Sequence, residues 1–311
     1  MAESNAKKHH YISACYLKYF ANPQKRTGRI YALDKDNKKQ YPTTPNDAGC
    51  KRDFNYVHAD GIHPNSLEDC LGESLEAYFP NVVDYIVNKC VVPKPKSDYY
   101  NILISLISLF TVRNPATRKK TEDFENRVRD VVLDMLVSKK EIWDSNLKNM
   151  KRDGYEAPNI KFKDVQNFVR NKKYEISYPK GYHIGREMDM QNTIFPYLYD
   201  RKWELLISDN KYFISSNKPV ILAPTTSKST CLPLGFGLKE TAVIFPLTNK
   251  MCLVGTFENK FRSRNISDLE VQEINGFVAK SDNRFIYSTE ESFSVFNYQT
   301  MISEKESIFL I

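Results

Sequence analysis

The spacing of apolar residues changes near residue 200, and this change most constrains what the chain can fold into. Between residues 66 and 200, apolar side chains recur every three or four positions, the period of one face of an α-helix. From Lys202 they form short runs separated by turn residues, as at 203–207 and 243–245, which is typical of strands. Segregated helices and strands predict an α+β fold, in which a helical layer packs on a mostly antiparallel sheet.

Start and stop signals divide the helical part of the chain. A short helix is expected over 13–20, where Asn22-Pro23 ends the pattern. The capping box that begins at Ser66 predicts a helix to about residue 89, which Pro80 should kink or break. Three further helices are expected. The first follows Pro95 and ends at residue 112, the second follows Pro115, and the third spans 181–199.

The expected strands are short. Residues 29–34 lie between Gly28 and the turn formers Asp36-Asn37, which predicts a hairpin whose second strand contains Tyr41. Ser267 and Glu270 predict a capped helix to about residue 280. Further strands are expected at 203–207, 212–214, 220–222, 243–245, 252–254 and 284–287. The chain thus reads as an N-terminal motif and irregular loop (1–65), a helical region (66–200) and a strand-rich region with one helix (201–311).

Composition restricts the class of protein. With 311 residues, 41% of them apolar, the chain can bury a substantial core. The apolar run at 102–110 is too short for a bilayer, which needs about 20 residues, and no secretory signal is visible, so we expect no membrane contact and a cytoplasmic location. The six cysteines include no close pair and are expected to be free thiols.

Positive charge is concentrated in the middle of the chain. Between Lys139 and Arg186 there are twelve Lys or Arg residues against six Asp or Glu, interleaved with aromatic residues such as Trp143, Tyr155 and Phe168. Cations that displace counterions from phosphates, together with rings on which bases stack, are the ingredients of single-strand recognition. Nucleic acid is therefore a candidate partner, and the alternative is a solvated basic face over an ordinary aromatic core.

The N-terminal residues Lys8-His9-His10-Tyr11 form the first candidate site. An imidazole of His9 or His10 could act as a general base near neutral pH, and Lys8 or Tyr11 could steady charge on a phosphate. Because neighbouring side chains of a strand point to opposite faces, only one of the two histidines should enter a given site. The alternative is that one histidine packs under the first helix and hydrogen-bonds a backbone carbonyl.

Two arginines flank Pro115 and form the second candidate site. Arg113 and Arg118 could clamp a phosphate, whereas the structural alternative for Arg113 is to cap its helix or to pair with a buried carboxylate. With His10 as base, an arginine that stabilises the charge of the transition state would suffice for metal-independent cleavage of RNA.

Four separated patches of the chain form one pattern. They are Lys8-His9-His10-Tyr11 with Tyr16-Leu17 and Phe20, Val112-Arg113-Asn114-Pro115 with Arg118, Trp203-Glu204-Leu205-Leu206 with Phe213-Ile214-Ser215-Ser216-Asn217-Lys218-Pro219-Val220, and Phe245-Pro246-Leu247. Together these patches resemble the bacterial domain-of-unknown-function family numbered 4238. The resemblance implies one continuous domain over 1–311 and no established reaction, and its bacterial context favours a role in phage defence or as a toxin.

The chain departs from the family pattern at one position. The pattern resembles Thr-Ser-Asp-x-Pro-Val, and here Asn217 follows Ser216 where the pattern has Asp. An amide can accept a hydrogen bond, but it cannot be a charged metal ligand or a general base. Ser216 and Asn217 are therefore candidates for substrate binding only.

Other short motifs are weak. Arg52 and His58 have the spacing of a helical ribonuclease motif but lie among turn residues, and His58, Asp60 and His63 are explained more simply as surface residues than as metal ligands. Gly235 and Gly237 lack the remaining residues of a phosphate-binding loop. No metal or cofactor is predicted.

These observations favour a cytoplasmic bacterial effector that binds and cleaves nucleic acid, with RNA as the favoured substrate. In this hypothesis His9 or His10 is the base, Arg113 acts with it, and Lys8, Tyr11, Arg118, Ser216 and Asn217 contact the substrate. The alternatives are a non-catalytic module that senses a nucleotide, a phage product or a protein, and a structural subunit. A regulatory protein partner and the oligomeric state are left open.

Overall fold

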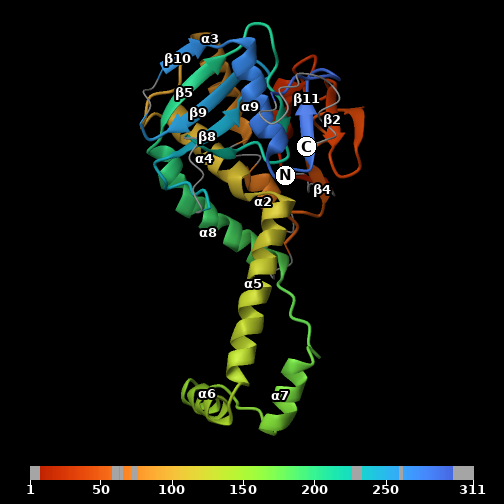
Figure 1. The fold of residues 1–311 in the computed structure, drawn as a ribbon, viewed down its shortest axis with the longest axis vertical. Coiled ribbons are helices and arrows are strands. Elements are labelled where there is room, and N and C mark those ends of the chain that lie inside the picture. Colours follow the sequence, from red (N-terminus) through yellow and green to blue (C-terminus); the bar gives the residue numbers. More distant parts are fainter. Residues whose placement is uncertain are drawn as a thin grey trace. The chain divides into compact units, whose positions relative to one another are not determined.

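The computed structural model describes residues 8–57, 63, 66–71, 76–225, 233–258 and 262–296. The chain divides into two compact units, one formed by Met1–Asn114 with Lys180–Ile311 and the other by Pro115–Pro179. We call the first the main unit and the second the helical unit. Figure 1 shows the elements of each.

The main unit contains a five-stranded sheet with the order β10-β5-β9-β8-β7. All neighbouring strands in it are antiparallel except β10 and β5, which are parallel. This confirms the predicted α+β class with a mostly antiparallel sheet, although β10 was not predicted. The strands are β5 (Lys202–Ile207), β7 (Ile221–Pro224), β8 (Thr241–Pro246), β9 (Met251–Thr256) and β10 (Arg262–Asn265).

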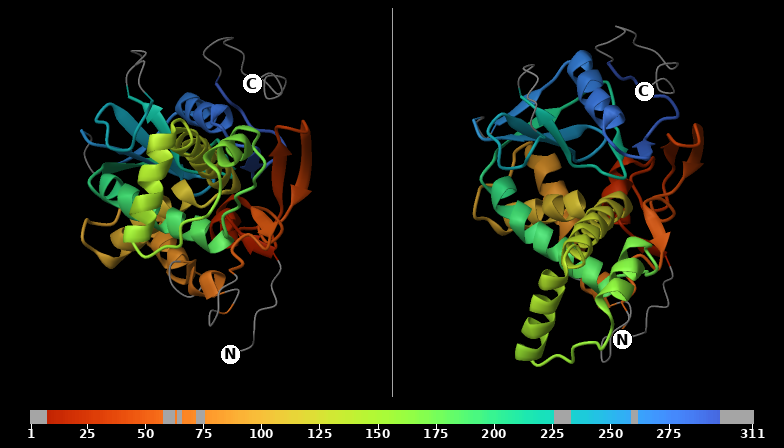
Figure 2. Two further views of the ribbon diagram at one scale, coloured as in Figure 1. Left: turned by 90° about the horizontal axis from the view of Figure 1, so that it is seen from below. Right: turned by 60° about the horizontal axis from the view of Figure 1, so that its bottom comes forward.

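Both faces of this sheet are covered by helices. Trp203, Leu205 and Phe245 lie in a core with residues of α3 (Ala77–Lys89) and α4 (Asp98–Val112). The alternate residues Leu206 and Ile244 pack with α9 (Asp268–Lys280) on the other face, and Figure 2 shows α9 in blue opposite α3 and α4 in orange to yellow. Burial on both faces explains why the strands are apolar runs and do not alternate with polar residues.

A second, four-stranded antiparallel sheet joins the two ends of the chain. Its order is β3-β2-β11-β6, and β2 and β3 form the predicted hairpin, with Ala32 opposite Tyr41. β11 lies between β2 and β6, so a strand from the C-terminal part fills the middle of a sheet that begins near the N-terminus. The strands are β2 (Ile30–Asp34), β3 (Lys39–Thr43), β6 (Ser215–Ser216) and β11 (Phe285–Ser288).

The first described residues form a small two-stranded sheet, in which β1 (Lys8–His10) is antiparallel to β4 (Cys50–Arg52). The predicted helix at 13–20 follows as α1 (Ala14–Leu17) and a 3₁₀ turn, η1 (Lys18–Phe20). It begins where the Ser13 hydroxyl accepts a hydrogen bond of 3.2 Å from the Cys15 N–H. Hydroxyl caps of this kind satisfy a backbone donor that the helix leaves unpaired.

The predicted helical segment begins at Ser66 with α2 (Ser66–Leu71) and ends at Lys89 with α3, and residues 72–75 between them lie outside the described residues. Pro80 lies in the first turn of α3 and does not break it, so the expected break at this proline was wrong. Proline is tolerated there because the first N–H groups of a helix have no partner within the helix. The helices expected before residue 112 and over 181–199 are confirmed as α4 and α8 (Lys180–Tyr199).

The helical unit consists of α5 (Pro115–Leu136), α6 (Lys140–Arg152) and α7 (Phe162–Arg170). Val137 and Val169 are buried in it, and the Gln166 amide donates to the Val137 carbonyl at 2.8 Å. α5 and α6 contain no buried residue. This unit is therefore held together by a small apolar contact and by polar bonds.

No described helix has both the length and the apolar character needed to cross a membrane. Cys15, Cys50, Cys70, Cys90 and Cys252 are free thiols, and Cys231 lies outside the described residues.

A nearly buried carboxylate closes the turn between β2 and β3. The Asp34 carboxylate accepts hydrogen bonds from Arg284 Nη2 at 2.7 Å and from Asn37 Nδ2 at 2.8 Å. The bond from Arg284 is the main reason why the pKa of Asp34 falls to about 2. Because Arg284 directly precedes β11, this pair ties the hairpin to the strand beside it.

We predict that Asp34→Asn lowers the free energy of unfolding at pH 7 by about 1–3 kcal/mol, because it removes a charge-assisted hydrogen bond. A carboxylate with a lowered pKa stabilises the fold above its unfolded-state pKa, and this contribution is lost as the pH falls toward about 2. Urea unfolding at several pH values should show the difference between wild type and variant shrinking between about pH 4 and pH 2. The control is Asp36→Asn in the same turn, and a pH-independent difference would contradict the prediction.

Candidate functional site

The strand β1 places the two histidines on opposite faces, as its alternation predicts. His9 is fully buried, whereas His10 is half-buried and Lys8 is exposed. The pairing of β1 with β4 fixes this arrangement, with His9 opposite Lys51 and His10 opposite Cys50. Only His10 and Lys8 therefore share the outer face of β1.

His9 is tied to the backbone of the main unit. Its Nδ1 accepts a hydrogen bond of 2.9 Å from the N–H of Asn55, a buried residue of the turn that follows β4. An acceptor nitrogen carries no proton, so His9 is the neutral tautomer protonated at Nε2. His9 thus satisfies a buried backbone donor, much as the structural alternative supposed, although in this bond the imidazole is the acceptor.

His10 and Lys8 contact the loop that precedes β4. The His10 Nε2–H donates to the Asn46 carbonyl at 3.2 Å, and the Lys8 ammonium pairs with Asp47 at 2.9 Å. The hydrogen bond to Asp47 raises the pKa of Lys8. Both partners of this ion pair are solvent-exposed, so the pair contributes little stability.

Arg113 is buried at the C-terminal end of α4 and holds β1 in place. Its Nη2 donates to the His10 carbonyl at 2.7 Å, and its Nη1 lies 3.9 Å from a carboxylate oxygen of Glu76. Only 4% of the Arg113 side chain is exposed. Its role as a phosphate ligand stays a prediction, and it requires a phosphate to reach a guanidinium that is almost fully buried.

Tyr11 turns into the core beside the two histidines. Its ring meets Phe54 edge-on with 5.9 Å between centroids, and its backbone N–H donates to Gly49. Burial raises the pKa of the Tyr11 hydroxyl to about 12. The ring therefore contributes packing and a neutral hydroxyl near neutral pH.

Ser216 and Asn217 bind their own surroundings in the four-stranded sheet. The Ser216 hydroxyl donates to the Lys218 carbonyl at 2.8 Å and accepts from the Lys218 N–H. Asn217 Oδ1 accepts from the N–H groups of Arg284 and Phe285, at 2.9 and 2.7 Å. These bonds fix the turn after β6 and the start of β11.

The structure brings some of the predicted site residues together. Lys8 and His10 lie on one face of β1, and Arg113 meets them through the His10 backbone. Ser216 and Asn217 belong to a different sheet, between β6 and β11. Arg118 lies in the first turn of α5 and belongs to the helical unit.

No group of three His, Cys, Asp or Glu side chains in the described ranges is placed to hold a metal ion. His63 lies 3.9 Å from Asp69, and both side chains are 44% exposed. His58 and Asp60, the other residues considered as ligands, lie outside the described residues.

Sequence reasoning missed two features of the main unit. His183 and Glu187 on α8 are both buried, with 8% and 6% of their surface exposed. Their spacing of four residues places them on one helix face. That spacing was visible in the sequence, but their burial was not.

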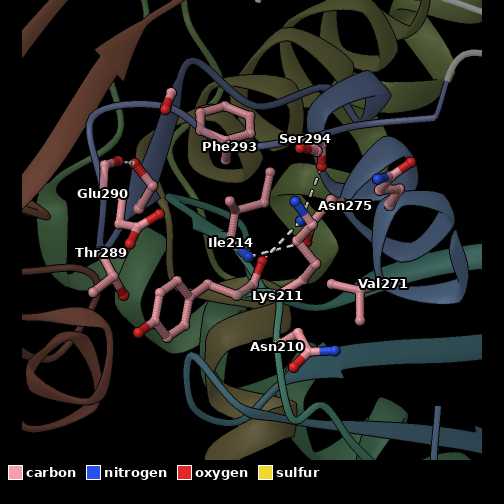
Figure 3. A pocket seen from close by; sticks show the side chains of 13 residues that line it. Asn210, Lys211, Ile214, Val271, Asn275, Thr289, Glu290, Phe293 and Ser294 are labelled. Carbon is pink, nitrogen blue, oxygen red and sulfur yellow. Dashed lines mark hydrogen bonds between the residues drawn. The ribbon is translucent and has the colours of Figure 1, made fainter. Parts of the chain in front are cut away.

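The second missed feature is a pocket of about 800 Å³ between α9, the end of β11 and the 210–214 segment. Asn275 joins the segments that line this pocket. Its Oδ1 accepts a hydrogen bond from the Ile214 N–H, and its Nδ2 donates to the Tyr212 and Ser294 carbonyls (Figure 3). Lys211 and Glu290 add opposite charges to a lining rich in hydroxyl and amide groups. Its size and lining suit a small polar ligand, and none of the predicted site residues lines it.

These features define an α+β protein with a five-stranded sheet covered on both faces, two smaller sheets and an inserted helical unit. Comparison with known proteins gives one match: the family described as a protein of unknown function, DUF4238, whose model matches residues 8–292. The chain belongs to this family, and the resemblance seen in its separated patches is confirmed. No curated protein and no solved structure matches the chain.

We predict that His9→Ala lowers the free energy of unfolding by about 2–4 kcal/mol, because it empties a core position and leaves the Asn55 N–H without this acceptor. His9→Asn is the matched control, since its amide oxygen can take the place of Nδ1 and should recover part of the loss. Thermal or urea unfolding measures both. Equal destabilisation by the two variants would argue against the role of the hydrogen bond.

Proposed function

We propose that this protein binds nucleic acid, with RNA as the favoured ligand, through the cations and aromatic rings of the helical unit. The observation that carries the proposal is the set of exposed cations on α6, α7 and the segments beside them. Within the described part of the chain, these cations form no ion pair: Lys148, Lys151, Lys161, Lys163, Arg170 and Lys173. Unpaired cations are available to replace the counterions of phosphates.

Exposed aromatic rings lie in the same unit. Tyr155, just after α6, is 68% exposed, and Phe168 on α7 is 48% exposed. The Phe168 ring lies 6.0 Å from that of Tyr174, and the Arg129 guanidinium lies 5.9 Å from the Tyr174 ring. Flat rings flanked by cations are surfaces on which unpaired bases stack. Single-stranded RNA loops present such bases, which is why RNA is the favoured ligand.

We predict that Lys163→Ala, Arg170→Ala and Lys173→Ala together weaken binding of single-stranded RNA at least tenfold. They should also lower the slope of log affinity against log salt by about 2, because each phosphate contact contributes about 0.7 to that slope. Fluorescence anisotropy at several salt concentrations measures both quantities. The matched control removes three exposed lysines of the main unit, Lys25, Lys39 and Lys94, and should leave both unchanged.

Tyr155→Ala separates stacking from charge in the same assay. It should weaken RNA binding by about 1–3 kcal/mol without changing the salt slope, because it removes no cation. If the triple variant binds RNA as the wild type does, the helical unit is not the binding surface.

We further propose that cleavage, if it accompanies binding, uses His10 as the base. The observation that favours His10 over His9 is its half-buried ring on the outer face of β1, next to the ammonium-bearing Lys8. An imidazole there can take a proton from a ribose hydroxyl, and the lysine can steady the negative charge that develops. Such an activity would suit a bacterial effector that acts in the cytoplasm, in phage defence or as a toxin under the control of a partner protein.

For this second proposal we predict that His10→Ala abolishes RNA cleavage and changes RNA affinity less than twofold. The measurement is turnover of labelled RNA beside its dissociation constant. His63→Ala, which removes another exposed imidazole, is the control and should cleave at the wild-type rate. Absence of turnover in the wild type would leave binding alone as the function, and full activity in His10→Ala would exclude His10 as the base.

A further inference from the structure

The helix α5 has two different long faces. On one face, Arg129 and Asp130 contact the segment of the helical unit that follows α7: Arg129 Nη1 donates to the Ile176 carbonyl at 3.3 Å, and Asp130 pairs with Lys172 at 3.3 Å. With about 3.6 residues per turn, the face that carries Val128 and Val131 lies roughly opposite. The polar contacts of α5 therefore leave its apolar face outward within the helical unit.

That outward face is a continuous apolar stripe. Phe124, Val131 and Met135 are 61%, 59% and 63% exposed, and Val128 is 45% exposed. The four residues follow one another at spacings of four, three and four, which is the repeat of a helix that packs along a partner helix. A row of large apolar side chains in water marks a contact surface.

We propose that this stripe binds the same stripe of a second copy of the chain, with the two α5 helices antiparallel. In one register every layer of the seam is apolar: Phe124 faces Met135 of the second copy, and Val128 faces its Val131. The two-fold axis repeats each contact, so one patch complements itself. The exposed Val132 lies at the edge of the same seam.

Charge supports the antiparallel register. In it, Arg127 beside the seam faces Asp134 of the second copy, and the symmetry makes this pair twice. Both residues are exposed. The Arg127 Nε–H donates a hydrogen bond to the backbone carbonyl of Asp123. In a parallel pair, Arg127 would instead face the apolar Val132. Opposite charges that meet only in one register select that register.

The seam is short, so the dimer should be weak. From Phe124 to Met135 the helix rises about 16 Å, which is roughly half the length of α5. We expect a dissociation constant on the order of 1–100 µM. This inference is independent of the nucleic-acid proposal, because oligomeric state is measured without RNA.

Sedimentation equilibrium of the full chain from about 1 to 200 µM tests the proposal. The wild type should pass from monomer to dimer, and Val131→Glu should raise the dissociation constant at least tenfold, because it places two carboxylates in the apolar seam. Glutamate favours a helix more than valine does, so the fold should persist. The matched control is Val87→Glu on α3, an exposed valine of the main unit, which should dimerise as the wild type does.

Charge reversal tests the register. Arg127→Asp should weaken the dimer severalfold, Asp134→Arg should do the same, and the double variant should return to within about threefold of the wild type, since the pair is then restored with its signs exchanged. A monomer at every concentration, or a dimer that Val131→Glu does not weaken, would overturn the proposal. Loss of the dimer in Val131→Glu without rescue by the double reversal would overturn the antiparallel register.

Discussion

The main unit is organised around one buried phenol. Tyr16 is fully buried, and its hydroxyl donates to the Pro246 carbonyl at 2.7 Å and shares a hydrogen bond of 2.7 Å with Ser215. Its ring stacks on Phe245 and lies 5.1 Å from Phe110 of α4. A buried hydroxyl must keep its partners, so α1, β6 and β8 can take only positions that satisfy these hydrogen bonds, and α4 packs against the ring through Phe110.

The residues that carry the family resemblance are explained largely by contacts of this kind. Tyr16 and Phe245 come from different patches and stack on each other, and Arg113 joins a third patch to the backbone of His10. Asn217 stands where the family pattern has Asp, and its oxygen accepts two backbone N–H groups. A carboxylate would accept the same bonds, which accounts physically for an amide at this position. Many residues of the family pattern thus connect segments that are far apart in the sequence.

Features that depend on residues close together in the sequence could be predicted, whereas features that depend on residues far apart could not. The capping box of α9 and the β2–β3 hairpin were predicted because their signals lie within a few residues. The place of β11 between β2 and β6 was not, because that pairing joins residues about 250 positions apart and no local signal specifies it. At the site, alternation along β1 predicted that one histidine would turn inward, but it could not say which, because that depends on the Asn55 N–H. The burial of Arg113 likewise depends on the distant His10 carbonyl.

The two units differ in how they use charge, and this difference favours a division of roles. In the main unit, the charged groups of Arg113 and Asp34 each form a hydrogen bond inside the protein, so these buried charges stabilise the fold. In the helical unit, the cations of α6 and α7 face solvent, and the apolar stripe of α5 lies on the face away from its polar contacts. A pair of α5 helices would join two such basic surfaces in one particle. When one basic surface binds a nucleic acid, the second is held near the same strand at a high effective concentration. A weak dimer could therefore bind a long nucleic acid with higher affinity than a monomer does, without any new contact.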